Sequence, residues 1–376
     1  MTEFRYNYNK RDILAPARQF ITDHLLVLDI ETTGLSPNKN MIYCIGLGYQ
    51  DEGRIQVHQL FAETLEEEAE ILSRLNQISR RFSQVLTFNG TTFDLPFLRR
   101  RSAFHGISCG IDHLRSLDLY REAMRIRRIF PMREYRQKSF EQFLGMQRED
   151  TMDGGALIPV FRRYTRQHQP EDLHLLRIHN QEDVYGLFPL LSLLAYNRLV
   201  EQGAFQIAEA GMTREEHPRL SVRIRLDHEL PVSLQLLTEA SGGAFLKNTD
   251  GLLEFPVHHG VLRHYFPDYR NYYYLPEEDT VIHKSIGKYV DSAHRSKATR
   301  ENCFLSTETD YLQLKRFRKD SFLKRSLKDK DTYIDLTPWK ESLQSGIAGL
   351  PADADPAFTD LLNRVICHWL SEYPEP

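Results

Sequence analysis

Runs of apolar residues near the start of the chain predict three strands of one sheet. Residues 25–28 are four consecutive aliphatic residues, and residues 41–48 form a second apolar run. Because both runs are short and almost wholly apolar, we expect buried strands rather than surface helices. Residues 54–60 alternate between polar and apolar positions, which indicates a third strand. The links are short and hold Pro, Asn, Asp and Gly, so the three strands could form an antiparallel meander.

Capping and periodicity predict the rest of a first domain, after a leader to about Asp23. Thr64 and Glu67 form a capping-box pattern that opens a helix to about Phe82. Strands and then helices around one mixed sheet indicate an α/β domain at residues 1–200. The further predicted elements are a strand at 85–88, a helix with Asp94 in its first turn, a strand at 115–120, helical segments over 120–164 with breaks at Pro131 and Gly154-Gly155, and a helix over 171–200 that Pro189 kinks or splits.

The pattern changes after Gly203. Residues 220–226 alternate between apolar and polar side chains, which is typical of a half-buried strand. Three more short apolar runs suggest further strands, with Gly242-Gly243 and Asp250-Gly251 as turns. Residues 278–300 are expected to return to helix. We therefore predict an accessory C-terminal domain at 201–376, β-rich and then helical, whose role is unknown.

Composition excludes few function classes. The net charge of −4 creates no strong overall field toward nucleic acid or membrane, so any polyanion must be bound by local basic patches. The four cysteines are far apart and form no Cys-x-x-Cys pair, which indicates reduced structural thiols. The N-terminus is polar, and no stretch approaches the roughly 20 apolar residues that span a bilayer. We expect a cytoplasmic protein without membrane contact.

Asp29 and Glu31 are the most informative residues in the chain. They follow the first apolar run and lie two apart, so in a strand both side chains project from the same face. Adjacent acids repel each other unless a cation lies between them. Hard divalent ions such as Mg²⁺ prefer oxygen ligands of this kind. The alternative is two solvated acids on a surface strand. It does not fit the four consecutive aliphatic residues that precede Asp29, because such residues are usually buried.

Two later segments carry acids that could join the first pair. Asp94 follows a strand and an Asn-Gly turn, so it can be directed back toward the end of the first strand. His179 and Asp183 are four apart and therefore share a helix face, while the neighbouring Glu182 is expected to face away. Alone, Asp94 would be an ordinary acid at a helix N-terminus, and the other two an exposed helix pair. The ordered combination favours a metal site.

The three segments resemble the three exonuclease motifs of the DEDD superfamily of 3′–5′ exonucleases. The matching stretches are Asp29-Ile-Glu-Thr-Thr-Gly-Leu, Phe88-Asn-Gly-Thr-Thr-Phe-Asp94 and His179-Asn-Gln-Glu-Asp183. Within that superfamily, residues 24–198 are most similar to the YprB-like ribonuclease-H-like proteins, which share the last motif. The resemblance implies a ribonuclease-H-like fold and a catalytic site made of Asp29, Glu31, Asp94, His179 and Asp183. It also implies two Mg²⁺ or Mn²⁺ ions, roughly 4 Å apart, held by the four carboxylates.

The spacing of the last motif departs from the superfamily pattern. Histidine-type members leave four residues between the general base and the last acid, whereas tyrosine-type members leave three and use Tyr. Here a histidine has the tyrosine-type spacing. Since an unperturbed histidine titrates near pH 6.5, His179 could still accept a proton from water at neutral pH.

Two basic stretches could contact a single-stranded end of DNA or RNA. Residues 121–138 and 315–330 combine Lys and Arg with aromatic residues, a pattern that suits phosphate pairing and base stacking. Each could equally be the solvated face of a helix. The cluster Tyr269–Tyr274 either packs a core or stacks on bases. The candidate substrate-binding residues are Thr32, Asn89, Phe93, Arg125 and Arg128.

The candidate metal site, together with the resemblance to the DEDD superfamily, thus predicts a metal-dependent 3′–5′ exonuclease that hydrolyses phosphodiester bonds. Two alternatives stay open: a structure-specific endonuclease on the same fold, and a nucleic-acid-binding module without turnover. Preference for DNA or RNA depends on contacts to the 2′-hydroxyl that the pattern does not define. Protein partners and oligomeric state are likewise undefined.

Overall fold

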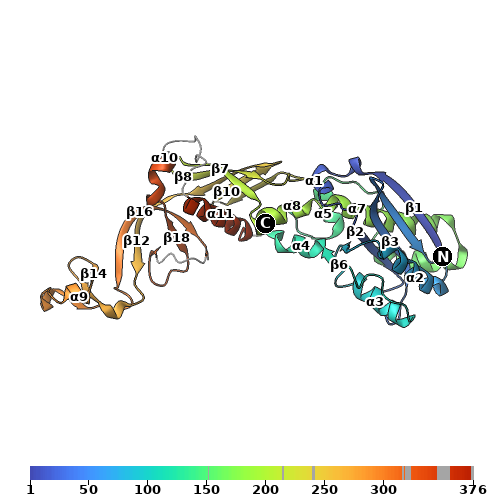
Figure 1. Cartoon of the computed structure of the whole chain (residues 1–376), viewed down its shortest axis with the longest axis horizontal. Helices are drawn as coiled ribbons and strands as arrows, with labels where there is room; N and C mark the ends of the chain where they lie inside the picture. Colours follow the sequence, from blue (N-terminus) through green and yellow to red (C-terminus); the bar gives the residue numbers. More distant parts are fainter. Residues whose placement is uncertain are drawn as a thin grey trace. The chain divides into compact units, whose positions relative to one another are not determined.

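The computed structural model describes residues 1–150, 152–213, 216–238, 242–315, 317, 323–344 and 356–373. The chain divides into two compact units (Figure 1). Unit 1 comprises Met1–Gln202 and His228–Val232, and unit 2 comprises Gly203–Asp227 and the chain from Ser233. None of the helices in the described ranges is long and apolar enough to cross a membrane.

Unit 1 contains a six-stranded mixed sheet. Its strands are β1 (Thr2–Asn9), β2 (Leu25–Thr32), β3 (Ile42–Asp51), β4 (Arg54–Phe61), β5 (Gln84–Thr87) and β6 (Arg115–Asp118), in the order β1-β4-β3-β2-β5-β6. The predicted meander is confirmed, because β3 pairs antiparallel with both β2 and β4. β5 and β6 extend the sheet in parallel with β2.

The expected leader is wrong, because residues 2–9 form a strand. β1 pairs antiparallel with β4 along its whole length, from Thr2 opposite Phe61 to Asn9 opposite Arg54. Its aromatic residues Phe4, Tyr6 and Tyr8 are partly buried, while the polar residues between them are exposed. This alternation is the ordinary sequence pattern of a half-buried edge strand.

The helices of unit 1 largely follow the predicted pattern. The Thr64–Glu67 capping box is present, and Pro189 lies in the last turn of α7, so the long helix is split as expected. The segment 120–164 holds three separate helices, and Gly154 begins the third rather than breaking it. The helices are α1 (Ala15–Arg18), α2 (Glu68–Ser79), α3 (Asp94–Phe104), α4 (Leu119–Arg125), α5 (Gln137–Phe143), α6 (Gly154–Gln167), α7 (Pro170–Leu190) and α8 (Leu193–Gln202).

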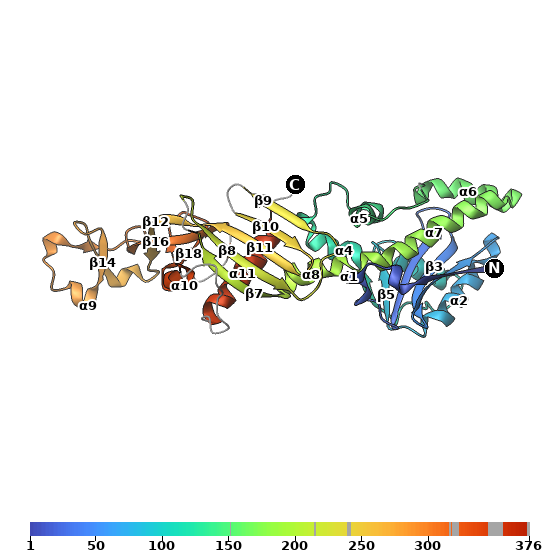
Figure 2. The ribbon, with the colours of Figure 1, turned by 90° about the horizontal axis from the view of Figure 1, so that it is seen from above.

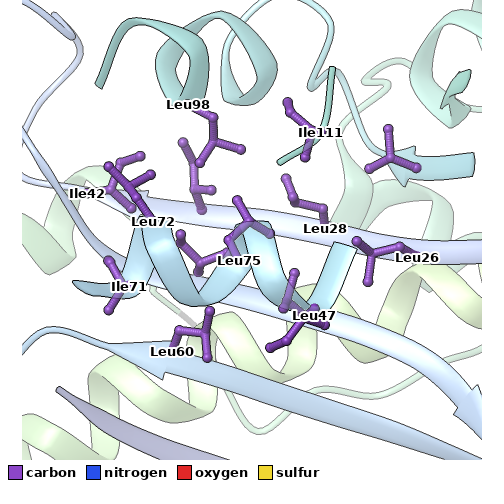
Figure 3. Packing of buried hydrophobic residues seen from close by; sticks show 14 of the residues in the cluster. Leu26, Leu28, Ile42, Leu47, Leu60, Ile71, Leu72, Leu75, Leu98 and Ile111 are labelled. Carbon is purple, nitrogen blue, oxygen red and sulfur yellow. The ribbon is translucent and has the colours of Figure 1, made fainter. Parts of the chain in front are cut away.

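Opposite faces of this sheet carry different layers. Leu26 and Leu28 point from β2 into a core that is closed by Leu72 and Leu75 of α2 and by Leu98 of α3 (Figure 3). The other face is covered by α6 and α7, which run side by side (Figure 2). Because side chains alternate along a strand, the odd-numbered acids of β2 face α7.

Helix α7 approaches the sheet closely at two glycines of β3. A Cβ atom added to Gly46 would lie 2.3 Å from Asn180 Oδ1 of α7, and one added to Gly48 would lie 2.7 Å from Phe188. Gly46 pairs with Asp29 across the ladder. The missing side chains therefore let the helix that carries the third motif lie against the strand that carries the first.

Unit 2 is β-rich and ends in a helix, as the sequence predicts. A five-stranded antiparallel sheet packs through Phe255 on Trp369 of α11 (Pro356–Ser371), with ring centroids 5.9 Å apart. A four-stranded and a three-stranded sheet follow. The three sheets contain β7 (Phe205–Met212), β8 (Arg219–Leu226), β11 (Asp250–Pro256), β10 (Gly242–Lys247) and β9 (Leu234–Thr238); β17 (Leu323–Lys324), β12 (His258–Tyr265), β16 (Phe304–Leu314) and β18 (Thr332–Asp335); and β14 (Thr280–His283), β13 (Tyr272–Leu275) and β15 (Ser296–Lys297).

The expected helix at 278–300 is wrong. The segment forms β14, the single turn α9 (Lys284–Gly287), a 3-10 turn at Ser292–His294 and β15. Its β-branched start pairs with the tyrosine-rich β13, and tertiary pairing overrides the local helical spacing of its apolar residues. The turn expected at Asp250-Gly251 lies two residues earlier, where Asn248 has φ +54° and β11 already begins at Asp250. Gly242, also expected in a turn, begins β10 with φ +105°.

We predict that Gly46→Ala destabilises unit 1 by about 1–3 kcal/mol, the usual cost of overpacking, because the new methyl group overlaps Asn180. Gly155→Ala is the matched control, since a Cβ atom there meets nothing within 4 Å. Urea denaturation of both variants measures the effect. Equal stability of the two would show that α7 does not need the space above β3.

Candidate active site

Residues of all three motifs line or adjoin one cavity of about 350 Å³ in unit 1. Asp29 and Glu31 lie at the end of β2, and His179 and Asp183 lie on the facing helix α7. Asp94, the first residue of α3, accepts a hydrogen bond from the backbone N–H of Ile30 at 3.2 Å, between the two acids of β2. The structure thus brings together all five residues predicted to be catalytic.

Three of these side chains form a group that could hold a metal ion. Ligand atoms of Glu31, His179 and Asp183 all lie within 4.8 Å of one another. His179 Nε2 is 3.5 Å from Glu31 Oε1 and 3.3 Å from Asp183 Oδ2. The carboxylates of this group are ligands that suit Mg²⁺ and Mn²⁺, whereas an imidazole suits softer transition metals.

Neighbouring polar groups orient the acids. Asn180 donates a hydrogen bond to Asp29 Oδ2 at 2.8 Å, and Gln59 of β4 donates to Asn180 Oδ1 at 3.0 Å. Asp118 at the end of β6 accepts hydrogen bonds from the backbone N–H groups of Asn89 and Thr91, which fixes the turn before Asp94. The acids are therefore held in place by the sheet and by α7.

Burial and mutual repulsion make these carboxyl groups reluctant to ionise. Burial raises the pKa of Asp29 and of Glu31 well above the ordinary range, and the charge of Asp183 adds to both shifts. Burial also raises the pKa of Asp94 from its ordinary 3.8 to about 7, although the Ile30 amide partly opposes this. Such a cluster is a strong candidate for a cation site, because a bound cation would relieve the repulsion.

Asp150, from the loop between α5 and α6, contacts the ring nitrogen of His179 that faces away from Glu31 and Asp183. Its Oδ2 lies 2.7 Å from His179 Nδ1, so an Nδ1–H would be donated to the carboxylate and Nε2 is directed at the acids. Burial opposes ionisation of Asp150, but the Met152 amide, His179 and Lys138 outweigh it and lower its pKa. His179 itself is only 4% exposed. The pairing fixes both the ring orientation and the tautomer.

A partly buried arginine in the same loop compensates the charge of the third motif. Arg148 donates a hydrogen bond to Asp183 Oδ1 and another to Glu141 Oε2, and its guanidinium lies 3.4 Å from Glu182. Glu182, which was expected to face away from the site, accepts hydrogen bonds from the backbone N–H groups of Glu149 and Asp150. It therefore anchors the loop that contacts His179 and Asp183.

The substrate-binding candidates separate into two groups. Thr32 and Phe93 line the cavity. Asn89 lies in the turn before α3 with φ +62°, Arg125 pairs with Glu122 at 3.1 Å, and neither they nor Arg128 line the cavity. The basic stretch 121–138 reaches the cavity at its end instead, through Arg136 and Lys138. In the other basic stretch, residues 316 and 318–322 lie outside the described residues.

Sequence reasoning missed the residues that orient the acids. Asn180 could have been found, because it lies three residues before Asp183 and hence on a neighbouring part of the same helix face. Arg148 and Asp150 are about 30 residues from the third motif and follow no pattern, so only the folded chain reveals them. Gly154 and Gly155, at the start of α6, also line the cavity.

Residues 26–195 match the model of a family described as the RNase_H superfamily, named RNase_H_2. Residues 26–195, a little under half of the chain, are thus similar to the RNase H superfamily. The match covers the six-stranded sheet from β2 onward and extends through α7, so it includes all three motifs. The predicted ribonuclease-H-like fold is confirmed. No curated protein matches the chain.

Several solved structures are distantly similar. A nuclease in its apo form is 15% identical, with a TM-score of 0.33, over 50% of this chain and 77% of that one. Escherichia coli exonuclease I in complex with a dT13 oligonucleotide is 12% identical, with a TM-score of 0.31, over 54% of each chain. A family B DNA polymerase from the archaeon Pyrobaculum calidifontis is 13% identical, with a TM-score of 0.36, over 66% of this chain and 35% of the polymerase. The chain thus spans about half the length of exonuclease I and a third of the polymerase.

We predict that Asp94→Asn stabilises the metal-free RNase H-like domain at pH 8. Because the folded protein holds the Asp94 proton up to about pH 7, whereas an ordinary aspartate releases it near 3.8, the stability of the EDTA-treated wild type falls as pH rises through that window. Asparagine removes this loss, a gain on the order of 1 kcal/mol or more, since each pKa unit corresponds to about 1.4 kcal/mol.

Thermal unfolding in EDTA at pH 5 and pH 8 measures this effect, with the exposed Asp12→Asn as the control. The result expected is a smaller pH dependence in Asp94→Asn only. The same pH dependence in Asp94→Asn and in the wild type would contradict the shifted pKa.

Proposed function

We propose that the protein is a metal-dependent 3′–5′ exonuclease that acts on single-stranded ends of DNA or RNA. The observation that carries the proposal is the convergence of Asp29, Glu31, Asp94 and Asp183, from three separate segments, beside His179 in one cavity. Such acids can hold divalent cations, which a nuclease needs because the phosphodiester is itself anionic and its hydrolysis adds charge at the phosphate.

The residues present fit divalent cations. Burial, followed by the charges of neighbouring acids, raises the pKa of Asp29, Glu31 and Asp94, and Arg148 is placed beside Asp183 rather than between the other three acids. Asp29, Glu31, Asp94 and Asp183 would hold two Mg²⁺ or Mn²⁺ ions. When bound, such ions lower the pKa of a ligand water and stabilise the departing oxygen.

His179 supplies the general base in this proposal. Its Nε2 is directed at Glu31 and Asp183, where the attacking water would be bound, and its Nδ1 is paired with Asp150. A proton taken by Nε2 gives an imidazolium whose charge the Asp150 carboxylate stabilises. The tyrosine-type spacing is then compatible with catalysis, because α7 lies close enough to β2 for a shorter-reaching imidazole.

The rim of the cavity suits a single-stranded end. Arg136 supplies positive charge for the phosphate backbone, while Lys138 lies at the same rim but pairs with Asp150 at 3.1 Å. The exposed backbone at Gly154 lies at the start of helix α6. Phe93 and the highly exposed Leu35 provide apolar surface on which an unpaired terminal base can pack. In a duplex the terminal base stays stacked on its neighbour, so it could not pack on this surface.

We predict that the purified protein, with Mg²⁺ or Mn²⁺, shortens a 5′-end-labelled oligonucleotide whose 3′ end is free by releasing mononucleotides from that end. The same oligonucleotide with a protected 3′ end should stay intact, and neither substrate should be shortened in EDTA. Asp29→Asn and Asp183→Asn should each lower the rate by about 100-fold or more, because charge stabilisation at the phosphate is lost. Asp12→Asn is the control of equal charge change.

Gel analysis of DNA and RNA substrates measures the activity, and a circular single strand separates the two cutting modes. Cleavage of the circular strand would show that the protein is an endonuclease rather than an exonuclease. If the protein binds these substrates but hydrolyses none of them with either metal, it is a nucleic-acid-binding module without catalytic activity.

We predict that Asp150→Ala lowers kcat by about 10- to 100-fold with little change in KM, as is typical when the residue that orients an active-site histidine is lost. Glu149→Gln is the matched control, since only its backbone contacts Glu182. The nitrogen-15 chemical shifts of His179 in the metal-free protein give an independent measurement. They should show Nδ1–H in the wild type and a mixture of tautomers in Asp150→Ala, and an unchanged spectrum would contradict the role.

A further inference from the structure

Residues 266–303 of unit 2 form a small module between the paired strands β12 and β16. Its three-stranded sheet has the order β14-β13-β15, and Figure 1 labels β14 and α9 in this part of the chain. One face of the sheet is the core of the module. Tyr272 and Tyr274 pack there with Val281, Ala298 and Cys303. Most of the tyrosine cluster therefore packs a core, as one of the two expectations for it stated.

Tyr273 points to the opposite face and has positive groups around it. The Arg295 guanidinium carbon lies 4.4 Å from the centre of the Tyr273 ring, and Lys284 Nζ lies 5.6 Å from it. Lys297 is directly opposite Tyr273 in the ladder, so its side chain leaves the same face. Two cations thus share one aromatic ring, with a third beside them.

The lysines and arginines of this module form no ion pairs with described residues of the chain. Within the described part of the chain, no carboxylate lies within 4.0 Å of any of the six residues Arg270, Lys284, Lys288, Arg295, Lys297 and Arg300. Lys284 and Arg295 instead donate hydrogen bonds to the backbone oxygens of Arg270 and Gly287. Residues 280–300 contain five lysine and arginine residues and Asp291 as their only acid, whereas the other acids of the module lie before and after this stretch, at Asp268, Glu277, Glu278, Asp279 and Glu301. A local concentration of positive side chains of this kind attracts a polyanion.

Exposed apolar and aromatic groups lie beside these cations. Tyr289 is 81% exposed and Ile286 is 62% exposed. Lys288 Nζ lies 4.9 Å from the centre of the Tyr289 ring. An exposed aromatic ring with a cation against it is the combination that stacks an unpaired base while its phosphate is bound.

We propose that this face, which we call the module surface (Lys284, Lys288, Tyr289, Arg295 and Lys297), binds the backbone of single-stranded nucleic acid. The proposal rests on the proposed function, because it names a second contact for the same class of substrate. The lysines and Arg295 pair with phosphates, and Tyr289 stacks on a base. The absence of any sequence-reading acid or amide on the surface indicates binding without base preference.

The test is fluorescence anisotropy of labelled oligo(dT) and oligo(U) with the full chain in EDTA, across a series of salt concentrations. The double variant Lys288→Gln/Lys297→Gln removes two charges whose side chains form no ion pair in the described structure. Arg219→Gln/Lys247→Gln, at two exposed positions of the five-stranded sheet, is the control with the same charge change. Thermal unfolding verifies that each variant is folded.

The proposal predicts that the slope of log affinity against log salt falls by about 1.4 in the double variant, since each lost phosphate contact in a single strand accounts for about 0.7. It also predicts about 5-fold or more weaker binding for Tyr289→Ala, at a position too exposed to affect folding. The control should match the wild type.

Each other outcome overturns the proposal. One such outcome is a salt dependence of affinity in the double variant that equals that of the wild type, and another is an equal loss of affinity in the control variant. The others are a wild type that binds no oligonucleotide, and a wild type that binds only anionic lipid vesicles. The result is separable from the catalytic proposal, because EDTA removes hydrolysis from the assay. If the wild type hydrolyses nucleic acid with metal but the module-surface variants bind oligonucleotides as tightly as the wild type, only the proposed role of the module surface is refuted. If those variants lose binding but the wild type hydrolyses no substrate, only the proposed nuclease activity is refuted.

Discussion

The close contact of α7 with the central strands is the constraint on which the site depends. Gly46 provides the space into which Asn180 fits, and Asn180 in turn holds Asp29 by a hydrogen bond of 2.8 Å. The same approach places His179 and Asp183 within a few ångströms of Glu31. A helix held even one side-chain layer farther away would separate His179 and Asp183 from the acids of β2 and would remove the hydrogen bond from Asn180 to Asp29.

Concentrating acids in this way is costly, and the surrounding loop compensates part of the cost. Arg148 neutralises Asp183, and Asp150 keeps His179 oriented, while Glu182 anchors the backbone that carries both. Asp29, Glu31 and Asp94 keep raised pKa values despite this support. Stability is thus sacrificed at the place where a divalent cation would restore it, which is the usual relation between stability and function at such sites.

The elements and acids with local signals were predictable from the sequence, and those that depend on distant contacts were not. The apolar run before Asp29 and the spacing of His179 and Asp183 identified the site because strand and helix periodicity are local properties. The strand β1 and the short elements over 278–300 were missed, since their conformation follows from pairing with β4 and β13. Arg148 and Asp150 act across about 30 residues of chain, and no periodicity connects them with α7.

The most direct measurement of the central claim is anomalous diffraction from crystals grown with Mn²⁺, recorded at the manganese absorption edge. The account predicts anomalous peaks about 2.0–2.2 Å from carboxylate oxygens of β2 and α7, the distance expected for such ions. Peaks elsewhere, or none beside Glu31 and Asp183 in crystals soaked at high concentration, would contradict the claim that the packing of α7 on β2 and β3 builds a metal-dependent active site.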